Sequence, residues 1–391
     1  MKAIDLGKFC ATVAVVAIVI LGLGLNAADG QQVDKSNTAV PVVVMPKFGG
    51  QILGYDIDHN GTEGLLAEYV AENGGKNRVA VEVFDQKTGA ITAVVAEKNE
   101  TLQDYAAIEI NGDDLGLVLF QKAGQNNFLT LNPLTANKFT GVWTPPIKSG
   151  YGVSQMSVAR GTNVAVFEND LNAGDSYVVS SNVADNTFSS AVSLSSIISV
   201  DEFLVNPVIA LGRTKDEVVL ADSHDCPEKI PSCASSIAMV NLTTGKITEF
   251  DDDLGVGQVN GLAVDPVKGI AVTTTLADMG VEFYNLKAQT GFEEILPGAT
   301  SEIQAGDDVE FDPVHKLFLV AQYTSTGDIN NPQPRVYVYN EAGKLMETVT
   351  TLPRIPVSPT RIVLNPSTRT GFLVIIAEPS NTASELESFK Y

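Results

Sequence analysis

The stretch Val259–Leu286, VNGLAVDPVKGIAVTTTLADMGVEFYNL, decides the fold. Gly261–Val264, Ile270–Thr275 and Val281–Leu286 are short runs rich in β-branched and other apolar residues, which is typical of β-strands. Asp265–Gly269 separates the first two runs and is typical of a tight turn. Because short strands joined by tight turns do not bury both faces alone, we expect the rest of the chain to supply similar neighbours.

The same pattern recurs along the chain at a regular spacing. Each unit begins with an apolar run that ends in a turn, and three further short strands follow. A period near fifty residues with several strands per period is typical of a β-propeller, whereas a β-sandwich lacks this long period and a helical solenoid needs helical stripes. The last apolar residues before the first turn of each unit are 47 to 53 residues apart: Ile57, Ile110, Val158, Leu211, Val264, Phe311 and Leu364.

These observations predict an all-β fold, a seven-bladed β-propeller of four-stranded antiparallel blades that forms one domain over residues 39–391. The last unit stops at Tyr391, after its third strand. We expect the N-terminal run Ala39–Met45 (AVPVVVM) to supply the missing fourth strand. This strand would close the ring by joining the first and last blades.

Residues 1–28 have the pattern of a secretory signal peptide: Lys2 and Lys8, then the apolar run Ala11–Leu25, then small residues. A retained membrane anchor is the alternative, but this run is short for a membrane span. We therefore expect cleavage, a flexible segment at residues 29–38, and no membrane span in the mature chain. The expected location is secreted or extracellular, and periplasmic in a Gram-negative host.

Two cysteines remain after the expected cleavage, Cys226 and Cys233 in the segment HDCPEKIPSCAS. In an oxidising compartment, this short offset around two prolines predicts a local disulfide bond.

The chain is strongly acidic, with a formal net charge of -22, and 44% of its residues are hydrophobic. The apolar content predicts a packed core and argues against a disordered chain. The charge argues against nucleic acids and anionic membranes as partners, because an acidic surface repels phosphate. Cations, neutral sugars and basic partners fit this charge better.

The predicted loops between second and third strands are long, while the turns between first and second strands are short. In a propeller the long loops share one face, the long-loop face, with the entries to the innermost strands, and binding groups are usually found on such loops. Converging amide and carboxylate oxygens suit a hard cation such as calcium, and the alternative is that they cap strand ends around a solvated channel. The residues before each innermost strand form the candidate site: Asp104, Gln155, Asn206, Asn260, Asp307, Asp308 and Arg361.

Two segments, VNGLAVDPVKGIAVTTT (259–275) and GDDVEFDPVHKLFLVAQ (306–322), resemble blades of secreted propellers. The families concerned are the SMP-30/gluconolactonase, strictosidine-synthase-like, NHL and YncE-like lactonase-type propellers. The resemblance implies a hydrolase or lactonase with calcium or another divalent cation, Asn260 as one ligand and Asp308 or Asp307 as another. The acidic ligand that these hydrolases hold near the first blade has no counterpart, since Gly54 and Tyr55 occupy that entry.

Other metal or catalytic motifs are weak. Residues 56–61 (DIDHNG) open like an EF-hand calcium loop, but Ala67 stands where that loop needs glutamate, so we interpret them as a hairpin turn. The histidines lie in three different units: His59 and His315 in short turns, and His224 in the predicted cysteine loop. No Gly-x-Ser-x-Gly, Walker or His-Glu-x-x-His motif is present.

Three hypotheses follow. The favoured one is a secreted binding or scaffold propeller with a small molecule, a carbohydrate or a protein at the long-loop face, and it favours a binding protein over an enzyme. The second is a divalent-cation-dependent hydrolase or lactonase acting in the central channel. The third is a structural extracellular protein. A fold does not determine a function, so the ranking depends on the incomplete catalytic set.

Overall fold

The computed structural model describes most of the compact unit Lys35–Tyr391, and the predicted signal peptide (1–28) and flexible segment (29–38) lie outside the described residues. The described ranges are 41–58, 61–71, 77–97, 108–111, 115–122, 125–131, 134, 138–143, 152–158, 163–170, 175–182, 187–188, 191–194, 208–214, 216–224, 234–250, 259–275, 280–296, 306–322, 335–350, 361–376 and 384–391. These residues contain strands and turns but no helix, so none of their segments is a helix able to cross a membrane.

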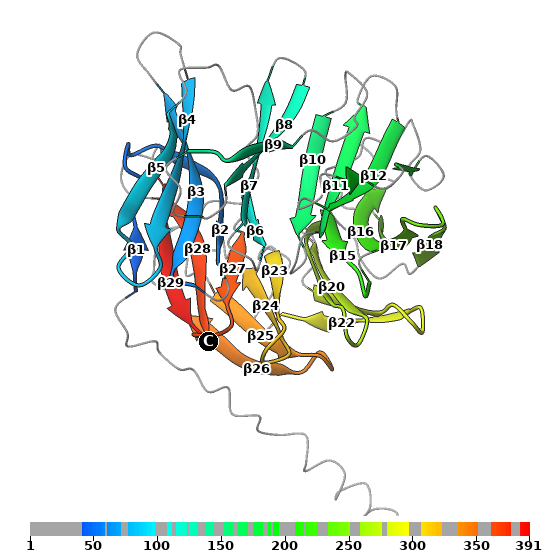
Figure 1. The fold of residues 1–391 in the computed structure, drawn as a ribbon. Coiled ribbons are helices and arrows are strands. Elements are labelled where there is room, and N and C mark those ends of the chain that lie inside the picture. The colour runs from blue at the N-terminus through cyan, green and yellow to red at the C-terminus, as the bar shows by residue number, and fades with distance from the viewer. Residues whose placement is uncertain are drawn as a thin grey trace, which may run out of the picture. The chain divides into compact units, whose positions relative to one another are not determined.

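The strands form antiparallel sheets in which consecutive strands pair in chain order (Figure 1). The first three sheets are β2 (Gln51–Ile57), β3 (Glu63–Ala71), β4 (Asn77–Asp85) and β5 (Ile91–Glu97); β6 (Ile108–Asn111), β7 (Leu115–Lys122), β8 (Gln125–Leu131) and β9 (Gly141–Trp143); and β10 (Gly152–Val158), β11 (Asn163–Asp170) and β12 (Asp175–Asn182) with β13 (Thr187–Phe188) and β14 (Val192–Ser193). Both β13 and β14 pair with β12, so the single fourth strand expected there is divided into two.

The next three sheets have the same plan. They are β15 (Val208–Leu211), β16 (Glu217–His224), β17 (Ala234–Asn241) and β18 (Ile247–Phe250); β19 (Val259–Asp265), β20 (Ile270–Thr275), β21 (Gly280–Asn285) and β22 (Thr290–Ile295); and β23 (Gly306–Asp312), β24 (Leu317–Gln322), β25 (Arg335–Asn340) and β26 (Leu345–Thr350). The opening stretch, Val259–Leu286, therefore forms the first three strands of one sheet, as predicted.

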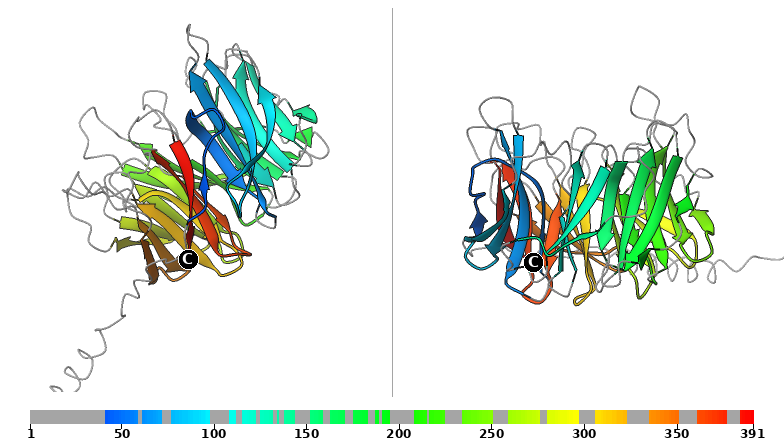
Figure 2. Two further views of the ribbon diagram at one scale, coloured as in Figure 1. Left: turned by 90° about the vertical axis from the view of Figure 1, so that its left-hand side faces the viewer. Right: turned by 45° about the horizontal axis from the view of Figure 1, so that its top comes forward.

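The last sheet combines both ends of the described chain, in the order β1 (Val43–Val44), β29 (Ser384–Lys390), β28 (Thr370–Ile376) and β27 (Ile362–Asn365). Figure 2 shows β1, in blue, beside the red C-terminal strand. The strand is shorter than the predicted Ala39–Met45, because Pro41 and Pro46 flank it and proline has no N–H to donate. The pairing fits the predicted role of this segment, while the number of blades in a ring and the closure of that ring stay predictions.

The apolar core lies between neighbouring sheets. Phe283 of β21, for example, packs edge-on against Phe318 of β24 and Tyr339 of β25 in the next sheet, with ring centroids 6.1 and 5.7 Å apart. The second strands are buried on both faces, as their continuous apolar runs predicted: Phe318, Leu319 and Val320 have no exposed surface.

Side-chain oxygens close the tight turns. The Asp265 Oδ1 accepts the N–H groups of Val267 and Lys268 at 2.9 and 3.3 Å, and Gly269 follows with a φ of 71°, a conformation that glycine adopts without strain. The end of the sheets that carries these first-to-second and third-to-fourth turns is called the turn face below. The strands on both sides of residues 59–60 form a hairpin, as interpreted: Ile57 pairs with Gly64 and the Asp58 N–H donates to the Glu63 carbonyl at 3.0 Å, while His59 and Asn60 lie outside the described residues. The same turn device recurs at Asp85, Asn241, Asn285, Asp312 and Asn340.

Candidate functional site

A β-bulge recurs near the start of the innermost strands. The strand register shifts at this point in β2, β10, β19 and β23. Each bulged residue lies four positions before the last apolar residue of its strand. Bulges redirect side chains and are frequent beside binding sites. The four bulged residues, called the bulge set below, are Leu53, Ser154, Asn260 and Asp307.

The bulge set belongs to the end of each sheet opposite the turn face. Each innermost strand runs from its bulge toward its first turn, so the bulged residue lies beside the connections between second and third strands. The innermost strands of consecutive sheets are also neighbours: β19 contacts β15 and β23, and β2 contacts β6 and β27. Leu53 is 39% exposed and Asn260 is partly exposed, so both are available to a ligand.

Asp308 and Arg361, two members of the predicted site, each link innermost strands of different sheets. Asp308 joins the adjacent strands β23 and β27, whereas Arg361, just before β27, reaches β6 on the far side of β2. The Asp308 Oδ2 accepts the Ile362 N–H at 2.8 Å, and the Arg361 Nη1 donates to the Ile108 carbonyl at 3.1 Å. Burial raises the pKa of Asp308 to about 6, although the Ile362 N–H and the Arg361 charge oppose this change. Both side chains therefore satisfy backbone groups that no sheet partner reaches.

Two further residues, which the sequence analysis did not select, make the same kind of link. The Tyr55 hydroxyl donates to the Arg361 carbonyl. The Asp56 Oδ2 accepts the Ile110 N–H at 2.6 Å, so β2 is tied to β6. Burial raises the pKa of the Tyr55 hydroxyl, which therefore stays protonated and able to donate.

The structure describes only some residues of the predicted site. Asp104 and Asn206 lie outside the described residues, and Gln155 and Asp307 are described as strand positions without their side chains. Asn260 and Asp308 belong to adjacent strands, because Gly261, next to Asn260, touches the Asp308 backbone. Sequence reasoning missed Ser154 because it selected the next residue, Gln155, and missed Leu53 because it selected no residue of β2. Their constant spacing from the end of each strand was the available signal.

The described residues offer little to a calcium ion. Calcium takes six to eight oxygen ligands, and one Asp308 oxygen already accepts an N–H group. Among the residues whose side chains are described, no group of three histidine, cysteine, aspartate or glutamate side chains is placed to hold a metal. The predicted cation at Asn260 and Asp308 therefore lacks a sufficient ligand set in this part of the chain.

Cys226 and Cys233 also lie outside the described residues. His224 was expected in the cysteine loop, but it is the last residue of β16 and pairs with Ala234, the first residue of β17. Strand pairing continues through the polar residues 222–224, which polarity alone had assigned to a loop.

Comparison with known proteins supports the fold only. No protein-family model matches the chain, and no curated protein matches it by sequence. Solved structures do match. The WD40 repeats of RRP9 align with a TM-score of 0.59 at 11% identity, covering 90% of this chain and 98% of that one.

The chain has the β-propeller fold. The propeller of Dos1 aligns with a TM-score of 0.53 at 9% identity, covering 90% of this chain and 95% of that one. An oligogalacturonate lyase in complex with manganese aligns with a TM-score of 0.53 at 11% identity, covering 93% and 98%. These propellers include both repeat proteins and an enzyme, so the shared fold does not select one activity.

Proposed function

We propose that this protein is a secreted, non-enzymatic binding propeller whose ligand site lies on the long-loop face, around the bulge set. The observation that carries the proposal is the bulge repeated at one position of β2, β10, β19 and β23. A bulge interrupts sheet pairing and is retained where it redirects a side chain. Four equivalent bulges at one end of the innermost strands, two of them on the neighbouring strands β19 and β23, therefore support a surface built for recognition.

The chemistry of the described residues favours binding over catalysis. Asp308 and Arg361 hold backbone groups of β27 and β6, so neither side chain is free for substrate chemistry. The accessible groups are the Leu53 side chain and the Asn260 amide, one apolar and one neutral polar. Such a mixture suits a carbohydrate or a protein segment, which presents apolar surface and hydrogen-bonding groups together.

Selection experiments test this proposal. Mature protein would be used on a glycan array and to select peptides from a random phage library, with Leu53→Asp and Asn260→Ala as the test variants. Val267→Asp is the matched control, because Val267 is 71% exposed on the turn face. We expect the selected ligand to lose at least tenfold in affinity with both test variants and to bind the control normally. Unchanged binding by both test variants, or no ligand from either library, would overturn the proposal.

A second candidate function, a divalent-cation-dependent hydrolase or lactonase, is favoured by the adjacency of the Asn260-Gly261 pair and Asp308. If a cation binds there, calcium raises the melting midpoint relative to chelator, because a ligand that binds only the folded state stabilises it. Asn260→Ala combined with Asp308→Ala should abolish that difference, and a panel of lactones and esters would then test turnover. No calcium effect on the wild-type protein would exclude this candidate.

A further inference from the structure

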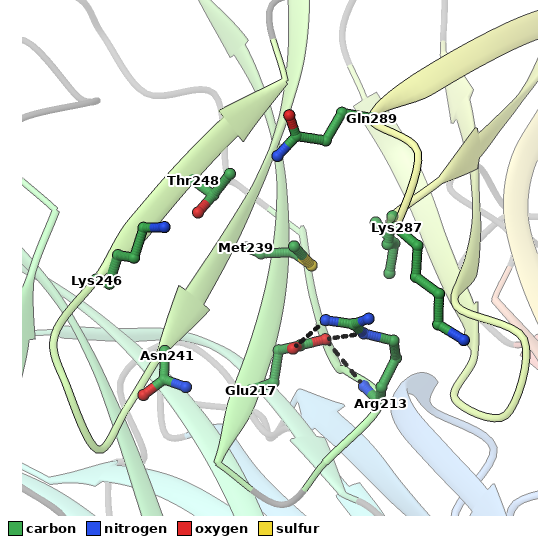
Figure 3. Close-up of a pocket in the computed structure, with 9 residues that line it drawn as sticks. Arg213, Glu217, Met239, Asn241, Lys246, Thr248, Lys287 and Gln289 are labelled. Carbon is green, nitrogen blue, oxygen red and sulfur yellow. Dashed lines mark hydrogen bonds and ion pairs between the residues drawn. The ribbon is translucent and has the colours of Figure 1, made fainter.

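A pocket of about 370 Å³ lies on the turn face, between the β15–β18 sheet and the β19–β22 sheet. Lys246 and Asn241 belong to one wall, from the β17–β18 hairpin, and Lys287 and Gln289 belong to the β21–β22 turn on the other wall (Figure 3). Met239 lies between the two walls. This volume is within the range of small-molecule sites, roughly 300–1,000 Å³.

The charge of this pocket differs in sign from that of the chain. The protein has 47 acidic and 25 basic residues, yet Arg213, Lys246 and Lys287 line the pocket with a single carboxylate, Glu217. Neither lysine forms an ion pair with another described residue. The pocket therefore has an excess of positive charge that no described side chain compensates.

The Arg213–Glu217 pair gives one end of the pocket a defined shape. Arg213 Nε and Nη2 donate to the two Glu217 oxygens at 3.0 Å each, and the Arg213 N–H donates to Oε1 at 3.1 Å. Burial disfavours the charged carboxyl, but the hydrogen bonds from Arg213 outweigh it and lower the pKa of Glu217. The ionised pair holds the guanidinium in place and leaves Nη1 for another acceptor (Figure 3).

Neutral hydrogen-bonding groups line both walls beside these charges. The Asn241 Oδ1 accepts the Thr243 and Thr244 N–H groups at 3.1 and 2.8 Å, so its amide nitrogen is left to donate elsewhere. The Gln289 amide also lines the pocket (Figure 3). Lys246 extends toward Thr248 in this view, while Lys287 stands on the rim, where its long flexible chain allows it to turn toward a ligand.

We propose that this pocket binds a small anionic molecule that also carries hydroxyl groups, such as a sugar acid or a sugar phosphate. The anionic group pairs with Lys246, Lys287 and the free Arg213 Nη1, and the hydroxyl groups bond with Asn241, Thr248 and Gln289. Charge gives the attraction, and the neutral groups select for hydroxyls over bare ions. The site belongs to the turn face and is independent of the binding surface proposed above.

Calorimetric titration of the mature protein tests the proposal, using galacturonate, glucose 6-phosphate, inorganic phosphate and neutral glucose at low and high salt. We expect one or both sugar anions to bind, more weakly at high salt, and glucose not to bind. Lys246→Ala combined with Lys287→Ala should weaken this binding at least tenfold without a change in melting midpoint. Lys87→Ala, at an exposed turn-face lysine outside the pocket, is the matched control and should bind as the wild type does.

The ligand arms separate the two sources of negative charge. Binding of galacturonate alone identifies a carboxylate site, and binding of glucose 6-phosphate alone identifies a phosphate site. Inorganic phosphate that binds as tightly as glucose 6-phosphate would overturn the requirement for hydroxyls. Equal binding of glucose, unchanged affinity in the double variant, or no binding of either sugar anion would overturn the site itself.

Discussion

Gly261 of β19 lies directly against Asp308 of β23: a Cβ atom built on Gly261 would stand 2.7 Å from the Asp308 Cα and 2.7 Å from the Val309 nitrogen. Real side chains do not approach backbone so closely, so the short distance between β19 and β23 at residue 261 requires glycine there. The Asn260-Gly261 pair, which the resemblance to hydrolases presents as a cation motif, thus has a packing explanation for its second residue.

Enlarging Gly261 should destabilise the protein progressively. Gly261→Ala forces β19 and β23 apart, and overpacking of this kind costs about 1–3 kcal/mol. Gly261→Val should cost more, because its side chain is larger. Unfolding in guanidinium chloride measures both changes. At Gly245, with a φ of 68° and no atom within 4 Å of a built Cβ, alanine and valine should both cost mainly backbone strain. If the loss of stability increases from alanine to valine by a similar amount at Gly261 and at Gly245, the loss at Gly261 does not come from its contact with Asp308.

Asp308 should make stability depend on pH. Its pKa is about 6 in the folded protein against an ordinary 3.8, so the folded state binds this proton more tightly. The resulting stabilisation is complete below about pH 3.8 and is lost as pH rises through about 6. Asp308→Asn keeps an oxygen for the Ile362 N–H and removes the titration. Urea unfolding measures this: between pH 4 and pH 7 the free energy of unfolding of the variant should rise relative to that of the wild type. A constant difference between the two proteins over this range would contradict the prediction.

Glu82 should also make the protein less stable as the pH rises, but at a higher pH than Asp308 does. Burial raises its pKa to about 7 from 4.5, and the neighbouring Glu68 adds to this effect. The two carboxyls hold the segment between β1 and β2, since Glu82 accepts the Lys47 N–H at 3.0 Å and Glu68 accepts the Phe48 N–H at 3.1 Å. The stabilisation that comes from protonating Glu82 is complete below about pH 4.5 and is lost as the pH rises through about 7.

The measurement is the melting midpoint at pH 5 and pH 8. Glu82→Gln should reduce the fall in midpoint between these two conditions. Asp85→Asn is the control, because Asp85 is on the same strand but partly exposed, and hydrogen bonds from Thr88 lower its pKa. If the melting midpoint falls equally in Glu82→Gln and in the wild type, Glu82 is not responsible for the pH dependence of stability.

Gln86 should be a strong point of attachment between the first and last sheets. Its buried amide nitrogen donates to the Asp58 and Glu63 carbonyls at 2.9 and 2.5 Å, and its oxygen accepts the Asn365 Nδ2 at 2.9 Å. Gln86→Ala leaves buried polar groups without these bonds, which costs about 1–3 kcal/mol for such a group. Urea unfolding should show this loss, while the exposed neighbour Lys87→Ala should change stability by less than about 0.5 kcal/mol.

Cys226 and Cys233 should form the predicted disulfide in protein from an oxidising compartment. His224 pairs with Ala234, so the chain leaves the two strands side by side, two residues before Cys226 and one residue after Cys233. Non-reducing peptide mapping should recover the two cysteines in one cross-linked peptide. Two free thiols in secreted protein would show that the prediction is wrong.

The candidate site was harder to predict than the fold. Asn260 and Asp307 were selected as possible ligands, and both are bulged residues, but Leu53 and Ser154 occupy equivalent positions without suggesting a site. Asp308 was selected for its carboxylate, and that carboxylate accepts a backbone N–H from the next sheet. Residue type alone does not show whether a polar group faces a ligand or the protein itself.

The sequence by itself determined the strands and their turns, because these depend on near neighbours: apolar runs, the aspartate or asparagine that opens each turn, and the glycine that ends some of them. Only the tertiary structure decided which residues of one sheet contact which residues of the next. The contact of Gly261 with Asp308 and the pocket between Arg213 and Lys287 join residues from separate sheets, about 50 to 75 positions apart in the chain. Their neighbours depend on how one sheet packs on the next, and no local pattern in the sequence encodes that alignment.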